Sequence, residues 1–202
     1  MIHVIDNFLD DPYSVRALAL KAEYGPDPNG NWPGKRNEFV PDFIKDVIKK
    51  QVDKITGNET KFQACSFQYS TSQMGEGSFH CDHEMNDHNT TSLYTSVLFL
   101  SENNDIECGT EVCEYRVNLP KKLWENHLQT KKNFYLNGVN RRKHLRLVKR
   151  VNSYIKPNYI VPCKFNRMLF FPGHYPHRPQ NFYGTSIENS RLTIVSFLTF
   201  DQ

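Results

Sequence analysis

The sequence has no long apolar run and no paired-cysteine pattern. No window approaches the roughly 18 consecutive apolar residues of a membrane span, so we expect no membrane segment. The first residues lack a basic stretch followed by an apolar core, so we expect a cytoplasmic location and no secretory signal. The five cysteines are odd in number and form no CxxC, which argues against a disulfide framework or an all-cysteine zinc site. We expect reduced, mostly buried thiols.

The chain does have enough apolar and aromatic residues for a folded core. Its 202 residues are 38% hydrophobic and 13% aromatic, as in a globular chain rather than a disordered one. We expect one domain over residues 1–202, with a helical support at 1–60 and a β-rich body at 61–202. A basic insertion at about 118–152 interrupts that body.

Charge is unevenly distributed along the chain. The net charge is +3, but residues 121–150 hold ten Lys/Arg and one acid, which gives +9 there and leaves −6 elsewhere. A block of one sign is a surface feature that concerns partners, not the fold. With Trp124, Phe134 and Tyr135 among its cations, the block is compatible with nucleic acid, although a solvated arm or a protein-binding surface is the preferred interpretation.

The hydrophobic period changes near residue 60. Asp11-Pro12 is typical of a helix start, and 42–55 carries apolar residues at helical spacing before Gly57. Short β-prone runs follow at 62–69, 94–100, 111–117, 154–161, 167–171 and 192–200. This order predicts an α+β fold, mainly β, with a sandwich or jelly roll as its body. Residues 145–148 (LRLV) fit a strand or a helix equally well.

One segment, SFHCDHEMNDH at 78–88, concentrates potential metal ligands. At a strand end, residues two apart point to the same side, so His80 and Asp82 can reach one ion. Two imidazoles and one carboxylate on one face of an octahedral Fe(II) leave three positions open for substrate and O2. The third ligand should be a distant histidine, and FFPGHYPH offers His174 and His177. A polar loop without metal is the alternative for 78–88.

Three motifs occur in the order of a known family: HCD at 80–82, LFFPGHYPH at 169–177 and SRLTIVSF at 190–197. A strand ending in FLS and a Gly-Thr-Glu turn at 109–111 lie between the first two. The chain resembles the 2-oxoglutarate- and Fe(II)-dependent oxygenases, and within them the prolyl-4-hydroxylase-like branch in its small phage and bacterial form. The resemblance runs from about residue 62 to 200. It implies a double-stranded β-helix (jelly roll) with the N-terminal helices packed on one sheet.

The resemblance assigns the iron ligands. His80 and Asp82 would bind Fe(II) together with His177, which lies five residues after Pro172, a better match to the family spacing than His174. The neighbouring His83, Asp87 and His88 would then belong to a loop at the mouth of the site.

The resemblance also implies a cosubstrate site. Arg191 would hold the distal carboxylate of 2-oxoglutarate through its planar guanidinium. Thr193, two residues on, would add a hydroxyl from the same face of the strand. Tyr69 would donate to the cosubstrate or line the substrate pocket. The family often has a second tyrosine where this chain has Phe99, so that contact is in doubt.

The implied activity is hydroxylation of a C–H bond with decarboxylation of 2-oxoglutarate to succinate, and ascorbate could serve as reductant. The substrate, a protein side chain (prolyl-like) or a small molecule, is unknown, and its recognition would involve 24–40, 83–93 and 121–150. The loop NWPGKR at 31–36 would either cover the site or pack Trp32 on the barrel. The alternative function is a cupin-like metal-binding module without oxygenase activity, binding nucleic acid or a protein through 121–150.

Overall fold

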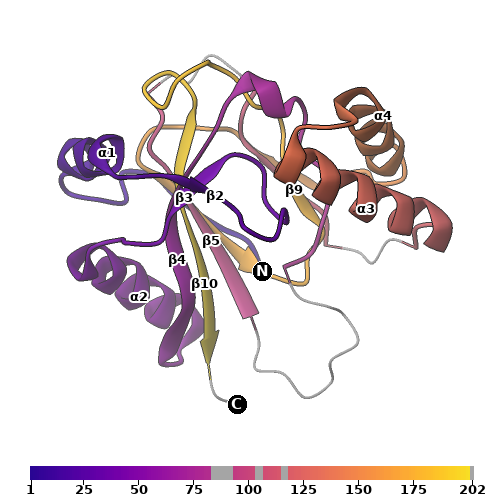
Figure 1. Ribbon diagram of the computed structural model, residues 1–202. Helices are drawn as coiled ribbons and strands as arrows, with labels where there is room; N and C mark the ends of the chain where they lie inside the picture. The colour runs from indigo at the N-terminus through magenta and orange to yellow at the C-terminus, as the bar shows by residue number, and fades with distance from the viewer. Residues whose placement is uncertain (83–92, 103–106, 115–117, 201–202) are drawn as a thin grey trace.

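Two antiparallel sheets form the body of the protein in the computed structural model, which describes residues 1–82, 93–102, 107–114 and 118–200 (Figure 1). The larger sheet has seven strands, in the order β1 (His3–Ile5), β8 (Arg167–Pro172), β5 (Leu93–Phe99), β10 (Arg191–Phe200), β4 (Thr60–Ser70), β3 (Lys35–Asn37) and β2 (Gly25–Pro26). The smaller sheet has the order β7 (Tyr159–Val161), β6 (Thr110–Val112), β9 (His177–Pro179). An apolar cluster that includes Val97, Phe171 and Val161 joins residues of both sheets.

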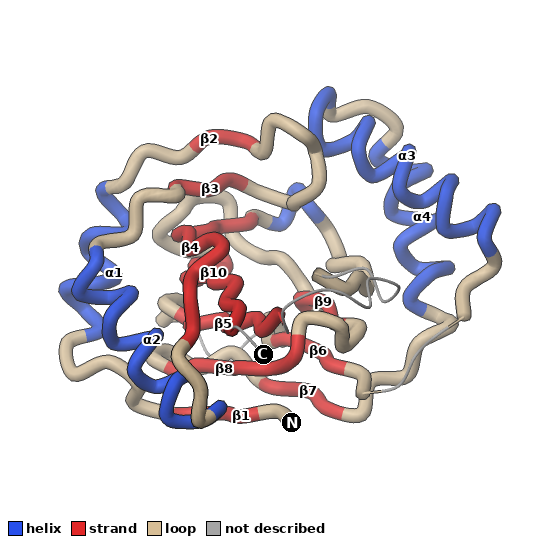
Figure 2. Tube along the Cα trace, turned by 90° about the horizontal axis from the view of Figure 1, so that it is seen from below, coloured by secondary structure: helices blue, strands red, loops and turns tan. Residues whose placement is uncertain are grey.

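Helices α1 (Pro12–Lys21) and α2 (Asp42–Thr56) cover the face of the large sheet that is turned away from the small sheet (Figure 2). The Asp11 carboxylate accepts the Ser14 N–H at 3.1 Å and caps α1, whose first residue is Pro12. Gly57 ends α2 at φ 70°, a backbone conformation that costs glycine little. The buried stripe of α2, at four-residue spacing, packs on the sheet.

Strand β10 shows how alternation separates core from site. Leu192, Ile194 and Leu198 belong to the core beneath α1 and α2. Arg191, Val195 and Phe197 have the opposite parity and line a hollow on the other face. Because β10 is paired on both sides, with β4 and β5, its register is firmly determined.

The basic segment folds as a helical hairpin of α3 (Lys121–Asn137) and α4 (Arg141–Asn152), well separated from α1 and α2 (Figure 1). Asn152 at the end of α4 accepts the Phe79 N–H at 3.1 Å and donates to the Gly77 carbonyl at 2.9 Å. The hairpin is thereby attached to the segment that leads into His80. The open choice for 145–148 is resolved as helix, with His144 and Val148 buried one turn apart.

Most predicted elements are confirmed, and the exceptions are short strands. The two-residue strand β2, which no β-prone run predicted, lies between α1 and β3. The strands predicted at 111–117 and 154–161 are each reduced to three residues, β6 and β7, and 115–117 lie outside the described residues. The five cysteines are free, as predicted. No helix among the described residues is long and apolar enough to cross a membrane.

Candidate metal centre

Backbone pairing brings the two histidines together. His80 and His177 form an isolated antiparallel bridge, with N–H···O distances of 3.0 and 2.9 Å between their backbones. The Asp82 N–H donates to the Gly173 carbonyl at 2.9 Å, which continues the pairing. Directly opposed residues of an antiparallel pair project to the same face, so the two rings lie 4.4 Å apart between centroids.

The three side chains converge on one point. Asp82 Oδ2 lies 3.2 Å from His177 Nε2, and Asp82 Oδ1 lies 3.7 Å from His80 Nε2. One potential ligand atom from each residue lies within 4.8 Å of the other two. The side chains of Asp82 and His177 are 2% and 7% exposed, against 30% for His80, so the cluster opens to solvent on the His80 side.

Each ring has its outer nitrogen bound to the backbone. His80 Nδ1 donates to the Ser78 carbonyl and His177 Nδ1 to the Tyr175 carbonyl, both at 2.9 Å. A carbonyl only accepts, so these contacts place the proton on Nδ1 and leave the Nε2 lone pair directed inward. The Thr95 hydroxyl donates to Asp82 Oδ2 at 2.6 Å and orients the carboxylate. This arrangement of orienting partners is typical of a metal site.

The electrostatics favour a cation at the centre. Burial, reinforced by His177, lowers the pKa of His80 to about 4, so its ring is neutral at pH 7. Burial alone would raise the pKa of Asp82, but the adjacent histidines outweigh it and the pKa is lowered to about 2. Burial alone would lower the pKa of His177, but the neighbouring Asp82 carboxylate outweighs it and the pKa is raised. Burial raises the pKa of Cys81 to about 11, so its thiol stays protonated beside the cluster.

Arg191 lies in the same hollow as the cluster and is 6% exposed. Its Nε donates to the Cys108 carbonyl at 2.9 Å and its Nη2 to Thr110 Oγ1 at 3.2 Å, while the Phe99 ring lies 5.3 Å from the guanidinium. Within the described chain, its Nη1 group makes no hydrogen bond and no carboxylate pairs with it. Burial lowers the pKa of Arg191, with two cysteines and a tyrosine as its ionisable neighbours.

The other predicted site residues are placed as follows. Thr193 is fully buried on the same face of β10 as Arg191, and its hydroxyl lies 3.5 Å from the Gln68 carbonyl. His174 is exposed and is not part of the cluster. The prediction for Tyr69 is wrong. It pairs with Leu192, faces the core beneath the N-terminal helices, and meets Tyr24 edge-on at 5.0 Å.

Two predictions concerned loops. His83, Asp87 and His88 lie outside the described residues, as does all of 83–92. The Trp32 loop satisfies both interpretations given above. It lines the hollow, and its ring stacks on Phe197 of β10 at 5.8 Å.

Two polar residues of the hollow, Gln68 and Thr95, were missed in the sequence. Gln68 could have been found, because on β4 it has the opposite parity to the core residue Phe67. Nothing in the sequence marked Thr95. Arg36, which belongs to the loop predicted at 31–36, lies over the Trp32 ring at 4.0 Å and donates to Gln68 Oε1 at 3.3 Å.

The fold around this cluster is similar to that of enzymes of known structure, two of which are described as binding or depending on 2-oxoglutarate. HygX from Streptomyces hygroscopicus, crystallised with nickel and 2-oxoglutarate bound, aligns with a TM-score of 0.62 and 14% identity over 98% of this chain and 82% of its own. The carbocyclase SnoK from nogalamycin biosynthesis, described as non-heme and alpha-ketoglutarate-dependent, gives 0.60 and 13% over 98% and 79%. A Pseudomonas putida prolyl-4-hydroxylase gives 0.53 and 16% over 100% and 93%. At these identities the likeness shows a shared fold.

The chain belongs to the DUF6445 family, a family of unknown function whose model matches residues 1–198. A search of curated protein sequences finds no match.

Proposed function

We propose that this protein is a 2-oxoglutarate- and Fe(II)-dependent dioxygenase that hydroxylates a C–H bond. One observation carries the proposal: the buried guanidinium of Arg191, which pairs with no carboxylate in the described part of the chain, lines the same hollow as a two-histidine, one-carboxylate cluster. A metal site alone does not require the buried cation. A dicarboxylate cosubstrate does, because an unpaired buried charge is costly.

The cluster fits a ferrous ion. Two neutral imidazole nitrogens and one anionic carboxylate oxygen, supplied by His80, His177 and Asp82, are the facial donor set of non-heme Fe(II) oxygenases. All three approach from the protein side, so the side facing the hollow stays open to other ligands. In this proposal the two sheets are the two faces of a double-stranded β-helix, which brings the bridge between residues 80 and 177 beside β10.

Arg191 fits the distal carboxylate of 2-oxoglutarate. The Nη1 group points its donors at a ligand while Nε and Nη2 are held by the protein, so the guanidinium is already oriented. The Thr193 hydroxyl lies on the same face of the strand and can donate to the same carboxylate. Side chains of Val97, Val195 and Phe197 exclude water from the space between the guanidinium and the cluster.

When bound, Fe(II) and 2-oxoglutarate supply the reduction of O2 and the oxidation of a substrate C–H to C–OH, with loss of CO2 to give succinate. The chain's part is to hold both groups in register. Thr95 and the carbonyls of Ser78 and Tyr175 fix the ligand geometry. Ascorbate, which keeps iron ferrous, belongs in the aerobic assay.

The test is an anaerobic titration of Fe(II) into protein and 2-oxoglutarate, following the weak visible charge-transfer band of an iron–keto acid chelate. We expect the band in the wild type. In Arg191→Ala we expect 2-oxoglutarate affinity to fall by about 100-fold, the range for losing a charge-assisted pair. Arg142→Ala, an exposed arginine on α4, is the matched control and should titrate like the wild type.

Iron binding without a band at millimolar 2-oxoglutarate would reject the oxygenase. The cupin-like metal-binding module would then replace it. An Arg191→Ala protein that chelates 2-oxoglutarate as tightly as the wild type would reject the cosubstrate role of Arg191.

A further inference from the structure

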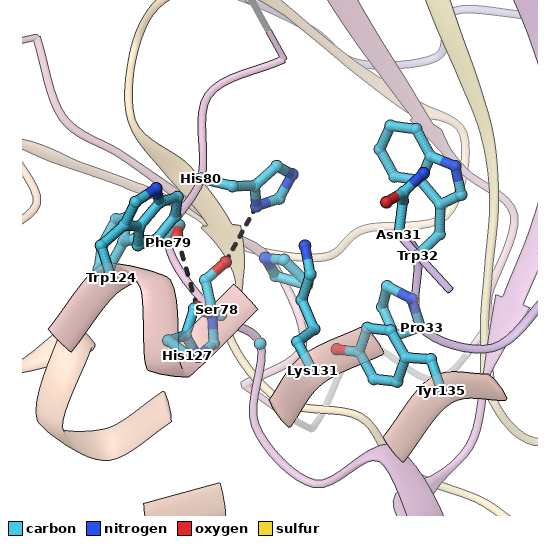
Figure 3. A pocket seen from close by; sticks show the side chains of 12 residues that line it. Asn31, Trp32, Pro33, Ser78, Phe79, His80, Trp124, His127, Lys131 and Tyr135 are labelled. Carbon is cyan, nitrogen blue, oxygen red and sulfur yellow. Dashed lines mark hydrogen bonds between the residues drawn. The ribbon is translucent and has the colours of Figure 1, made fainter. Parts of the chain in front are cut away.

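A second hollow adjoins the metal centre. It lies between the Trp32 loop and α3, and it shares Trp32, Pro33, His80 and Pro179 with the hollow that contains Arg191 (Figure 3). Both hollows are small and lined by side chains, which suits a small molecule rather than a folded partner. His80, the most exposed of the three clustered side chains, stands where they meet.

Lys131 of α3 supplies a positive charge to this second hollow. Its amino group points into the space between His80 and Asn31 in Figure 3. It is half-buried, makes no ion pair among the described residues, and burial lowers its pKa. Asp27 acts on it electrostatically, but the two Asp27 oxygens already accept the N–H groups of Asn29 and Asn31. Among the described residues, no carboxylate lies within ion-pair distance of the Lys131 amino group.

Arg36 supplies another positive charge from the opposite side of Trp32. Its Nη2 donates to Gln68 Oε1, and its buried Nε has no hydrogen-bond partner among the residues that the structure describes. Burial lowers its pKa to about 10, offset in part by Asp27, Asp82 and Glu38. An unpaired buried donor is costly unless a ligand satisfies it.

The charges of the whole cleft do not balance. Among the described residues, the charged side chains that line the two hollows are Arg36, Lys131 and Arg191, against Asp82 as the one acid. On the proposed function, on which this step rests, iron and 2-oxoglutarate contribute +2 and −2 and cancel. An excess of about two positive charges remains, and its carriers, Arg36 and Lys131, flank Trp32.

The rest of the second hollow is aromatic. Trp32, Trp124, Phe79 and Tyr135 line it, and Figure 3 shows them arranged around the Lys131 amino group. Such walls accept flat apolar groups. We infer that this hollow is the substrate subsite and takes a small molecule with an apolar ring and one anionic group, a carboxylate or phosphate, which Lys131 binds beside His80.

The test uses the chain's own tryptophans. There are two, Trp32 and Trp124, and both line the hollow, so intrinsic fluorescence reports its occupancy. The apo protein, without iron or 2-oxoglutarate, is titrated with phenylacetate, phenyl phosphate and neutral phenylacetamide. We expect a saturable change with at least one anion and at least about tenfold weaker binding of phenylacetamide. The anion that binds with the higher affinity shows whether the hollow prefers a carboxylate or a phosphate.

Two neighbouring lysines give a matched pair of variants. Lys131→Met should lower the affinity for the better anion by about tenfold or more. Lys132 is an exposed lysine of the same helix, and Lys132→Met should keep the affinity within about twofold of the wild type. Melting temperatures confirm that both variants fold. Three outcomes would overturn the inference. They are no saturable fluorescence change with either anion, equal affinity for phenylacetamide and the better anion, and a loss of anion affinity in Lys132→Met as large as that in Lys131→Met.

A competition experiment distinguishes the proposed substrate hollow from the 2-oxoglutarate site at Arg191. Binding of the better anion should persist at saturating 2-oxoglutarate, whereas displacement would place the probe on Arg191 and overturn the inference. Because this experiment needs no iron, its outcome is independent of the charge-transfer band. A band with no probe binding rejects the substrate subsite alone, and probe binding without a band rejects the oxygenase alone.

Discussion

The two walls of the cleft are built differently. The strand wall holds His80, Asp82, His177 and Arg191, each oriented by a hydrogen bond to backbone or to a short side chain. The hairpin wall presents long side chains of α3, such as Lys131, with fewer polar contacts. The strand wall orients the ligand cluster, while a hairpin side chain such as Lys131 can be changed without removing any of these hydrogen bonds. We therefore expect reaction and recognition to be separable by mutation.

The largest effect should come from removing the carboxylate of the strand wall. Asp82→Ala should lower Fe(II) or Ni(II) affinity by more than about 100-fold, beyond the range for outer-shell partners, because it deletes the one anionic donor of the cluster. Calorimetric titration measures it. His174→Ala removes an exposed histidine of the same motif and should bind metal normally. Equal losses in both variants would contradict the assignment of the cluster.

A smaller loss should follow when only the orientation of that carboxylate is disturbed. Thr95→Val keeps the shape of the side chain and removes its 2.6 Å hydrogen bond to Asp82. Metal affinity should drop by about tenfold, the low end for outer-shell partners. Lys131→Met on the hairpin wall should leave metal affinity unchanged. If it does not, the two walls are not separable.

The hairpin wall should contribute to the acid sensitivity of the fold. His144 is fully buried between α3 and α4 with neither ring nitrogen hydrogen-bonded, and burial lowers its pKa to about 4. The unfolded chain, with a histidine pKa near 6.5, then binds the proton first, so stability is complete above about pH 6.5 and falls as pH drops toward 4.

The expected slope is up to about 1.4 kcal/mol per pH unit for this histidine. His144→Phe should flatten the decline in unfolding free energy measured between pH 7 and 5. His174→Phe, at an exposed site, should leave the decline as in wild type. An unchanged slope in His144→Phe would show that other groups cause the acid sensitivity.

The smallest effect should come from the outer face of the hairpin. Arg141, Arg142 and Lys143 are exposed, so neutralising all three to Gln should change unfolding free energy by less than about 0.5 kcal/mol per site and leave metal affinity unaltered. Any retention of wild type on DNA or RNA at low salt should vanish in this variant. A wild type that is not retained at low salt would end the nucleic-acid role of 121–150.

The strand wall was also the more predictable from sequence. His80 and Asp82 are two apart, and His177 follows a Phe-Pro turn, so their roles depend on local spacing. The long strands β4, β5, β8 and β10 followed from β-prone runs. Tyr69 was assigned to the wrong face of the sheet. Side chains of a strand alternate between the two faces with a period of two, so an error of one residue in the phase places a side chain on the opposite face.

The hairpin wall depends on docking that local patterns do not encode. LRLV at 145–148 is too short to distinguish strand from helix, and its helical fit becomes visible only with His144 and Val148 packed inward. Lys131 looked like one more cation of a basic block. Its position beside His80 is set by how α3 packs beside residues 77–80, and that of Arg36 by the short strand β3 next to the edge strand β2.

Ser78 links the two walls through a single residue. Its carbonyl accepts from the His80 ring, and its hydroxyl lies 2.8 Å from Nε2 of His127 on α3. In evolutionary terms, the hairpin is therefore not a freely exchangeable module. A chain that lost or replaced the hairpin would expose Ser78 and weaken the hydrogen bond that orients the His80 ring. The hairpin and residues 78–82 are therefore expected to be inherited together.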